Sequence, residues 1–419
     1  MSNKHYDIAI IGSSLAARIA AALLAKRGSK VLFLCHSEVT ASAWFHSSIF
    51  LEKLLGILGG RSCFVAQKPI QVLSRNARVT VCNDVPLDRE LSREFGKAGS
   101  TVLGWLDRLA SQGDQLEKIL WENGGLPWPS LKATTRFKLL CMRRKVSWSD
   151  LDAPVKTSMD QLPQSALIFV IDLLQGLSLK KIDELSRAQA ALLWAQTTRP
   201  ENLKEPDFSE LLSKRFDQFH GLKAPLENLS QLDFDGSCWT GGHLKDGGQF
   251  STNVFLLGDI RWIDRFAAGK TADMPAPPAL TKYRTGSLSG QLSPLLASRV
   301  ICGGDIPLQL TIEQDEDHVY GLLASGGATT GQQLQRQLEP VLPFARYELA
   351  EDGVQVEAQP SQTSAQQPQQ LANLPLRIGT NLYCADSYGM IAEMGASGAA
   401  LLGWTLAENL VTSRKQGKE

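Results

Sequence analysis

The 419-residue sequence has no net charge, no long hydrophobic run and no paired cysteines. Lys+Arg and Asp+Glu both number 43, so no overall charge draws the chain to nucleic acid or to acidic lipid. No run approaches the roughly 20 apolar residues of a membrane-spanning helix, and the longest, residues 166–171, ends at Asp172. We therefore expect neither a nucleic-acid partner nor a transmembrane segment.

The seven cysteines are scattered, and none belongs to a C-x-x-C pair. An odd, dispersed set indicates neither a zinc site nor a disulfide framework, so we expect no metal. The first predicted strand begins by Tyr6, which leaves no room for a signal peptide. These observations favour buried thiols in a reducing cytoplasm.

What the sequence does have, near its start, is the pattern of one βαβ unit. Residues 6–11 are an apolar run that leads into a turn of small residues, an alanine-rich segment closed by Gly28, and a second apolar run at 31–34. This order predicts a strand, a turn, a helix and a parallel strand. In a dinucleotide-binding protein, the backbone N–H groups at such a turn face the pyrophosphate.

The turn matches the dinucleotide pattern G-x-G-x-x-G/A only in part. Gly12 and Ala17 meet it, whereas Ser14 stands in place of the middle glycine. The acid expected about 20 residues further on falls at Cys35, followed by His36. An ordinary βαβ unit that binds no nucleotide is the alternative interpretation of this stretch.

The remaining chain alternates between helical and strand patterns, and its length favours two domains. Helices are predicted at 48–60, 88–123, 162–195, 208–219, 331–342 and 390–410. Strands are predicted at 70–73, 79–81, 229–234, 237–240, 249–258 and 382–385, and within the strand-rich region 274–323.

Three separated stretches, 4–34, 220–258 and 381–400, together resemble the FAD-dependent amine-oxidase and phytoene-desaturase-like flavoproteins. The first contains the turn at Gly12. In the second, Leu229 stands where a family valine lends its backbone to the adenine. The third, Ala385-Asp386 followed by a Gly/Ser/Ala-rich helix, resembles the C-terminal flavin motif.

The resemblance implies an α/β protein with the glutathione-reductase-like FAD/NAD(P)-binding fold. Residues 1–85, 205–265 and 373–419 would form a Rossmann-like FAD-binding domain, and residues 86–204 and 266–372 an α+β substrate domain. The cofactor-binding residues that follow from the motifs and the resemblance are Gly12, Ser13, Ser14, Leu15, Ala16, Cys35, His36, Leu229, Asp386 and Ile391.

The sequence departs from the family at four cofactor contacts. They are Ser14, Cys35, the missing Arg and Gly-Gly near 38–43, and the shortened Ala385-Asp386. Two functions therefore stay open. One is an FAD-dependent oxidoreductase that transfers hydride from a small or hydrophobic organic substrate to flavin; the other is a degenerate homologue that serves as a binding or scaffold subunit. The oligomeric state, the substrate and the electron acceptor stay undetermined.

No residue can be named as a catalytic acid or base. His46 falls where the family's chain passes near the flavin, and Tyr388 follows Asp386, but both also suit ordinary packing. Trp121 and Trp128 can line a hydrophobic substrate pocket or pack in the core. The segment 165–179 can lie on a membrane surface, but its basic residues sit at one end only, which favours a core helix and makes peripheral membrane contact unexpected there.

Overall fold

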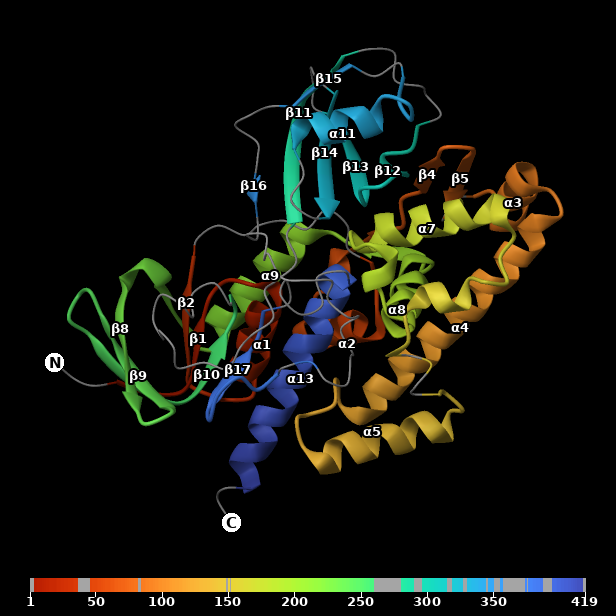
Figure 1. Cartoon of the computed structure of the whole chain (residues 1–419). Helices are drawn as coiled ribbons and strands as arrows, with labels where there is room; N and C mark the ends of the chain where they lie inside the picture. The colour runs from red at the N-terminus through yellow and green to blue at the C-terminus, as the bar shows by residue number, and fades with distance from the viewer. Residues whose placement is uncertain are drawn as a thin grey trace.

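The computed structural model describes residues 4–36, 46–81, 84–147, 150, 152–259, 280–289, 296–314, 319–326, 330–343, 346–349, 355–356, 374, 376–386 and 394–416. Within these ranges, two large sheets lie apart from each other, with helices around and between them (Figure 1). The α/β class predicted from the sequence is confirmed.

The first sheet combines strands from three distant parts of the chain. Its order is β7 (Leu222–Pro225), β2 (Val31–Cys35), β1 (Lys4–Ile11), β10 (Gln249–Leu257), β9 (Cys238–Leu244) and β8 (Leu229–Asp235), and β17 (Leu382–Cys384) also pairs with β10. The pairs β2–β7, β1–β2, β1–β10 and β10–β17 are parallel, whereas β8 and β9 form an antiparallel hairpin on β10. The three resembling stretches thus meet in one sheet, as expected.

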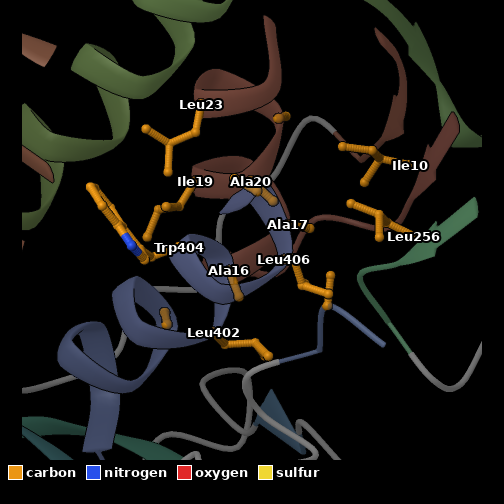
Figure 2. Close-up of a cluster of buried hydrophobic side chains, with 14 of the residues drawn as sticks. Ile10, Ala16, Ala17, Ile19, Ala20, Leu23, Leu256, Leu402, Trp404 and Leu406 are labelled. Carbon is orange, nitrogen blue, oxygen red and sulfur yellow. The ribbon is translucent and has the colours of Figure 1, made fainter. Parts of the chain in front are cut away.

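The helix after β1 has mostly small side chains, and these allow close packing against its neighbours. In α1 (Leu15–Lys26) ten of the twelve residues are buried, and most of these are alanine. The C-terminal helix α13 (Gly395–Gln416) packs against it (Figure 2). A Cβ at Gly403 would lie 2.8 Å from the Ala16 carbonyl oxygen, so this contact requires glycine. Two further helices, α2 (Ile49–Leu58) and α9 (Glu205–Gln218), complete the layer.

The second sheet contains two strands, at residues 70–74 and 77–81, that the sequence analysis assigned to the FAD-binding domain. Its order is β15 (Arg346–Leu349), β11 (Leu280–Ser289), β14 (Val319–Gly326), β13 (Leu308–Gln314), β12 (Arg299–Cys302), β4 (Ile70–Ser74) and β5 (Ala77–Val81), and β16 (Gln355–Val356) pairs with β11. The hairpin β4–β5 falls within 1–85, the first segment expected for the nucleotide domain. It nevertheless pairs with β12, parallel, with Val72 beside Ile301.

Helices between residues 87 and 197 form the remaining body of the molecule. They are α3 (Leu87–Phe95), α4 (Ala98–Asn123), α5 (Leu131–Arg143), α7 (Gln164–Ser178) and α8 (Arg187–Thr197). The helical region predicted at 88–123 is two helices, because Gly96 adopts φ 56° and ends the first. A short pair, β3 (Phe64–Ala66) and β6 (Glu201–Leu203), and helix α11 (Gly331–Leu338) complete the described elements.

Helix α7 decides whether the segment 165–179 is a core helix or a membrane-surface helix. Its residues Ala166, Phe169, Val170, Leu173 and Leu174 are buried in the core that also contains β4 and β5. The core-helix interpretation of 165–179 is therefore confirmed. None of the helices in the described ranges is long and apolar enough to cross a membrane.

Candidate functional site

The carboxyl ends of β1, β10 and β17 meet at the turn that starts α1. Gly12 has φ 104°, and its N–H donates to the Leu34 carbonyl at 2.9 Å. A Cβ at Gly12 would lie 2.6 Å from the backbone nitrogen of Asp259. Only glycine therefore fits here. The close partner of Gly12 is the Gly258–Asp259 segment.

Ser14 is the N-cap of α1 and also reaches across to β17. Its Oγ accepts a hydrogen bond from the Ala17 N–H at 3.2 Å and donates one to the Ala385 carbonyl at 2.5 Å. The side chain is buried, with 4% of its surface exposed. The Ser14 hydroxyl thus accepts the hydrogen bond of Ala17, the third helical residue. The N–H groups of Leu15 and Ala16 form the positive end of the helix, where an anion is favoured.

Asp386 lies where the sequence placed it, directly beyond β17. Ala385 donates its N–H to the Leu257 carbonyl at 2.8 Å and accepts from Ser14. These two bonds hold the following residue, Asp386, at the carboxyl edge of the sheet beside the turn. Its side chain is buried. Ligands bind in open α/β sheets at this edge.

At the end of β2, where a motif acid was expected at Cys35, the structure places His36 beside the carboxylate of Glu227. The N–H of His36 donates to Ser13 Oγ at 2.7 Å, which fixes His36 beside the turn. His36 Nδ1 lies 2.5 Å from Oε1 of Glu227. The backbone N–H of Glu227 and the His36 ring lower the pKa of the Glu227 carboxyl. Burial raises the pKa of the neighbouring Cys35 thiol, so this position is uncharged at neutral pH.

Sequence reasoning did not identify Glu227. It lies in a short 3-10 helix, η4 (Leu226–Asn228), between β7 and β8. Parallel pairing of Cys35 with Pro225 in β7 brings this helix to the end of β2. The available signal was its position two residues before Leu229, which is buried at the start of β8. Leu229 and His36 therefore belong to the same corner of the sheet.

His46 lies at the junction of three elements. Ser397 Oγ, in the first turn of α13, donates to the His46 carbonyl at 2.7 Å, and His46 forms an isolated bridge with Asn202. Burial, with a smaller effect from Arg299 of β12, lowers the pKa of His46 to about 3. The ring is neutral, and within the described part of the chain its Nδ1 has no hydrogen-bond partner.

An ionic network around the buried carboxylate of Glu117 reaches the backbone of Ile49, three residues after His46. Glu117 of α4 pairs with Arg199 and accepts from Gln196 Nε2 at 2.8 Å. It also accepts from the backbone N–H of Ile49, at the start of α2, at 3.4 Å. Burial raises the pKa of Glu117, and the Arg199 charge opposes this. The network joins α2, α4 and α8, and this explains its burial without a catalytic role.

The tryptophans proposed for a pocket pack against other aromatic rings. The Trp121 ring lies 5.6 Å from Phe50 and 5.1 Å from Trp404, and Trp128 stacks on Tyr383 at 5.3 Å. Core packing is the interpretation that these contacts favour. Two other candidates, Tyr388 and Ile391, lie outside the described residues, as do positions 37–45 that follow His36.

Comparison with known proteins identifies the fold. No family model and no curated protein matches the sequence. Among solved structures, an oxidoreductase from Methanosarcina mazei is similar over 96% of this chain and 100% of its own, with 12% identity and a TM-score of 0.60. Wild-type putrescine oxidase bound to putrescine covers 98% and 100%, with 12% identity and a TM-score of 0.58.

A third similar structure is RAB GDI from Plasmodium falciparum. It covers 97% of this chain and 98% of its own, with 12% identity and a TM-score of 0.54. The chain thus has the fold that these three structures share, and the fold implied by the resemblance is confirmed. One of the three is named as an oxidase, one as an oxidoreductase and one as neither, so function has to be argued from the site.

Proposed function

We propose that this protein is an FAD-dependent oxidoreductase that acts on a small or hydrophobic organic substrate. The observation that carries the proposal is the Ser14–Ala385 hydrogen bond. It joins the N-terminus of α1 to the end of β17 at the edge where such sheets bind dinucleotides. At Ser14 the hydroxyl caps α1, and beside Cys35 the carboxylate of Glu227 lies at the end of β2. Both departures therefore leave this edge suited to FAD.

The residues at the turn suit the pyrophosphate. The first turn of α1 contains no acidic residue, and the N–H groups of Leu15 and Ala16 are available to phosphate oxygens. Arg18 donates its Nε–H to the Ser13 carbonyl at 3.1 Å, which holds a positive charge beside the turn. We propose that these groups bind the pyrophosphate and that Asp386 accepts hydrogen bonds from hydroxyls on the ribityl side.

The end of β2 suits the adenosine ribose through Glu227. A carboxylate has about four acceptor positions, so the contact of His36 with Oε1 leaves capacity for a pair of ribose hydroxyls. The Glu227 side chain is 59% exposed and can reach a ligand at the surface. We propose that Glu227, oriented by His36, takes the role expected of an acid at Cys35, with Leu229 beside the adenine.

His46 suits the flavin end of the site. When bound, FAD supplies the hydride acceptor, and the protein supplies binding and orientation. A buried polar nitrogen needs a hydrogen-bond partner, and His46 Nδ1 can accept a hydrogen bond from a polar group of the substrate or the flavin, or donate one to it, according to the tautomer of the neutral ring. Its carbonyl is fixed by Ser397 at the start of α13. The proposed role of His46 is therefore to orient a polar group between the two sheets.

We also propose the domain division. Residues 1–69, 205–265 and 373–419 would form the FAD-binding domain, and the remainder the substrate domain. The pairing of β4 with β12 supports moving the hairpin at 70–81 out of the first segment. The six described cysteines are free thiols, which supports the cytoplasm as the compartment.

The test is reconstitution. Apoprotein is titrated with FAD, FMN and riboflavin, and binding is followed by flavin fluorescence. The proposal predicts saturable FAD binding that is much tighter than FMN binding, because FMN lacks the adenosine that Glu227 and Leu229 would contact. Reduction of the bound flavin by an amine panel then tests the oxidoreductase step. Absence of FAD binding would refute the proposal.

The second candidate is a scaffold subunit without flavin. It is favoured by the departures from the dinucleotide pattern at Ser14 and Cys35 and by the RAB GDI fold. A protein that is folded, colourless and unable to bind FAD would support this candidate.

A further inference from the structure

Helix α5 exposes more hydrophobic surface than any other element in the described part of the chain. One face packs on the core through Phe137 and Cys141, both 1% exposed. On the opposite face, Leu131 is 91% exposed, Met142 65% and Leu139 51%. The other large hydrophobic residues at the described surface are scattered and reach at most 49%. Figure 1 shows α5 at the lower edge of the molecule.

These exposed residues form one stripe. Leu131, Thr135, Leu139 and Met142 follow each other at steps of four, four and three residues, so they share a helix face. The Thr135 hydroxyl donates to the Leu131 carbonyl at 2.8 Å. Because this hydroxyl is already bonded within the helix, the stripe can enter an apolar environment without leaving it unsatisfied.

Basic residues flank the stripe on both sides. The segment 131–145 contains six lysines and arginines and no acid, although the whole chain is neutral. At 3.6 residues per turn, Lys138 falls on one side of the stripe, and Lys132 and Arg143 fall on the other. Within the described part of the chain, none of these three side chains forms an ion pair.

Two other basic residues hold the helix in place. Arg144 pairs with Glu122 at the end of α4, and Arg136 donates to the Glu122 carbonyl at 3.0 Å. The helix is thus fixed on the body of the protein with its apolar stripe outward. Its formation does not depend on a partner.

We propose that α5 is a peripheral membrane-binding helix, which lies in the plane of an anionic bilayer surface. An apolar stripe between two rows of cations matches the boundary between acyl chains and anionic headgroups. A nucleic acid would engage the cations but leave the apolar stripe between them in water. This proposal is independent of the proposed oxidoreductase function, and it moves membrane contact from 165–179 to α5.

The experiment is vesicle flotation with the full chain. Vesicles of phosphatidylcholine alone are compared with vesicles that also contain phosphatidylglycerol. The wild type should float with the mixed vesicles only, and salt should reduce this binding. Lys132→Gln with Lys138→Gln should weaken partitioning by about 25-fold, since each basic residue contributes about fivefold near such a surface. Leu139→Gln with Met142→Gln should weaken it by more than about tenfold.

Matched variants away from α5 serve as controls. Lys68→Gln with Lys214→Gln removes two exposed charges, and Ile168→Gln replaces a residue that is 44% exposed. Both should bind like the wild type. The proposal is overturned if the wild type does not bind mixed vesicles, or if the Leu139/Met142 variant still binds fully. It is also overturned if that variant changes only the oligomeric state, because the stripe would then be a protein interface.

Discussion

Replacing Glu227 with glutamine should weaken FAD binding by about ten- to a hundredfold. The carboxylate lies 2.5 Å from His36 Nδ1 at the end of β2, where it can accept a pair of ribose hydroxyls. Hydrogen bonds to a charged acceptor contribute roughly 1.5–3 kcal/mol, which corresponds to about one to two decades in dissociation constant. Glutamine keeps one acceptor oxygen but loses the charge.

The assay is a titration of apoprotein with FAD and with riboflavin, because riboflavin lacks the adenosine. Glu227→Gln should change only the FAD titration. Glu122→Gln is the matched control, since Glu122 is also an exposed carboxylate in an ion pair, here with Arg144. If Glu227→Gln binds FAD within twofold of this control, while the wild type binds FAD well, Glu227 has no role in the ribose site and the wider proposal stands.

Moving the acid from residue 227 to residue 35 tests whether FAD binding depends on the position of the carboxylate or only on its charge. Cys35→Glu alone should not tighten FAD binding, because it adds a second carboxylate near Glu227 in a half-buried position. In the Glu227→Gln background the same change should restore part of the lost affinity. If Cys35→Glu tightens binding in the wild type by tenfold, the expected motif acid is missing and Glu227 does not replace it.

Three further changes test the rest of the site. Ser14→Ala should lower the free energy of unfolding by about 2 kcal/mol, because a helix cap and the partner of a buried carbonyl are both lost; Ser130→Ala, which removes only the local cap of α5, should cost less in the same urea titration. Asp386→Ala should lower the flavin content of the purified protein, and unchanged occupancy would remove this residue from the site. The pKa of His46 falls from 6.5 to about 3 on folding, so between these values only the unfolded chain takes up the proton. Stability should therefore fall with decreasing pH below about 6.5, by up to about 1.4 kcal/mol per pH unit. His46→Gln should remove this part of the slope in urea midpoints measured against pH, and an unchanged slope would contradict the pKa argument.

The first βαβ unit could be predicted from the sequence because its signals are local. Residues 4–35 contain an apolar run, small residues at the turn and a second apolar run, and they form β1, α1 and β2. The joining of β1, β10 and β17 was also predictable, because motif order in the resembling family fixes which segments share a sheet. Local composition and a family pattern were sufficient for this part of the fold.

The remaining features depend on partners far away in the chain. From the sequence, Ser14 is only a departure from the motif, because its hydrogen bond to Ala385, 371 residues away, cannot be predicted. Glu227 reaches His36 only because β7 pairs with β2. The hairpin β4–β5 has its partner strand at residue 299 and beyond. None of these long-range pairings leaves a periodicity or a spacing in the sequence.

The central claim is that the turn at Gly12–Ala16 and the end of β17 form an FAD site. Its most direct test is the flavin content of the purified wild-type protein, measured by visible absorption and by identification of the flavin released on denaturation. We predict a yellow protein, or an apoprotein that becomes yellow after FAD is added and keeps the FAD through gel filtration. A folded protein that remains colourless after saturation with FAD would contradict the account.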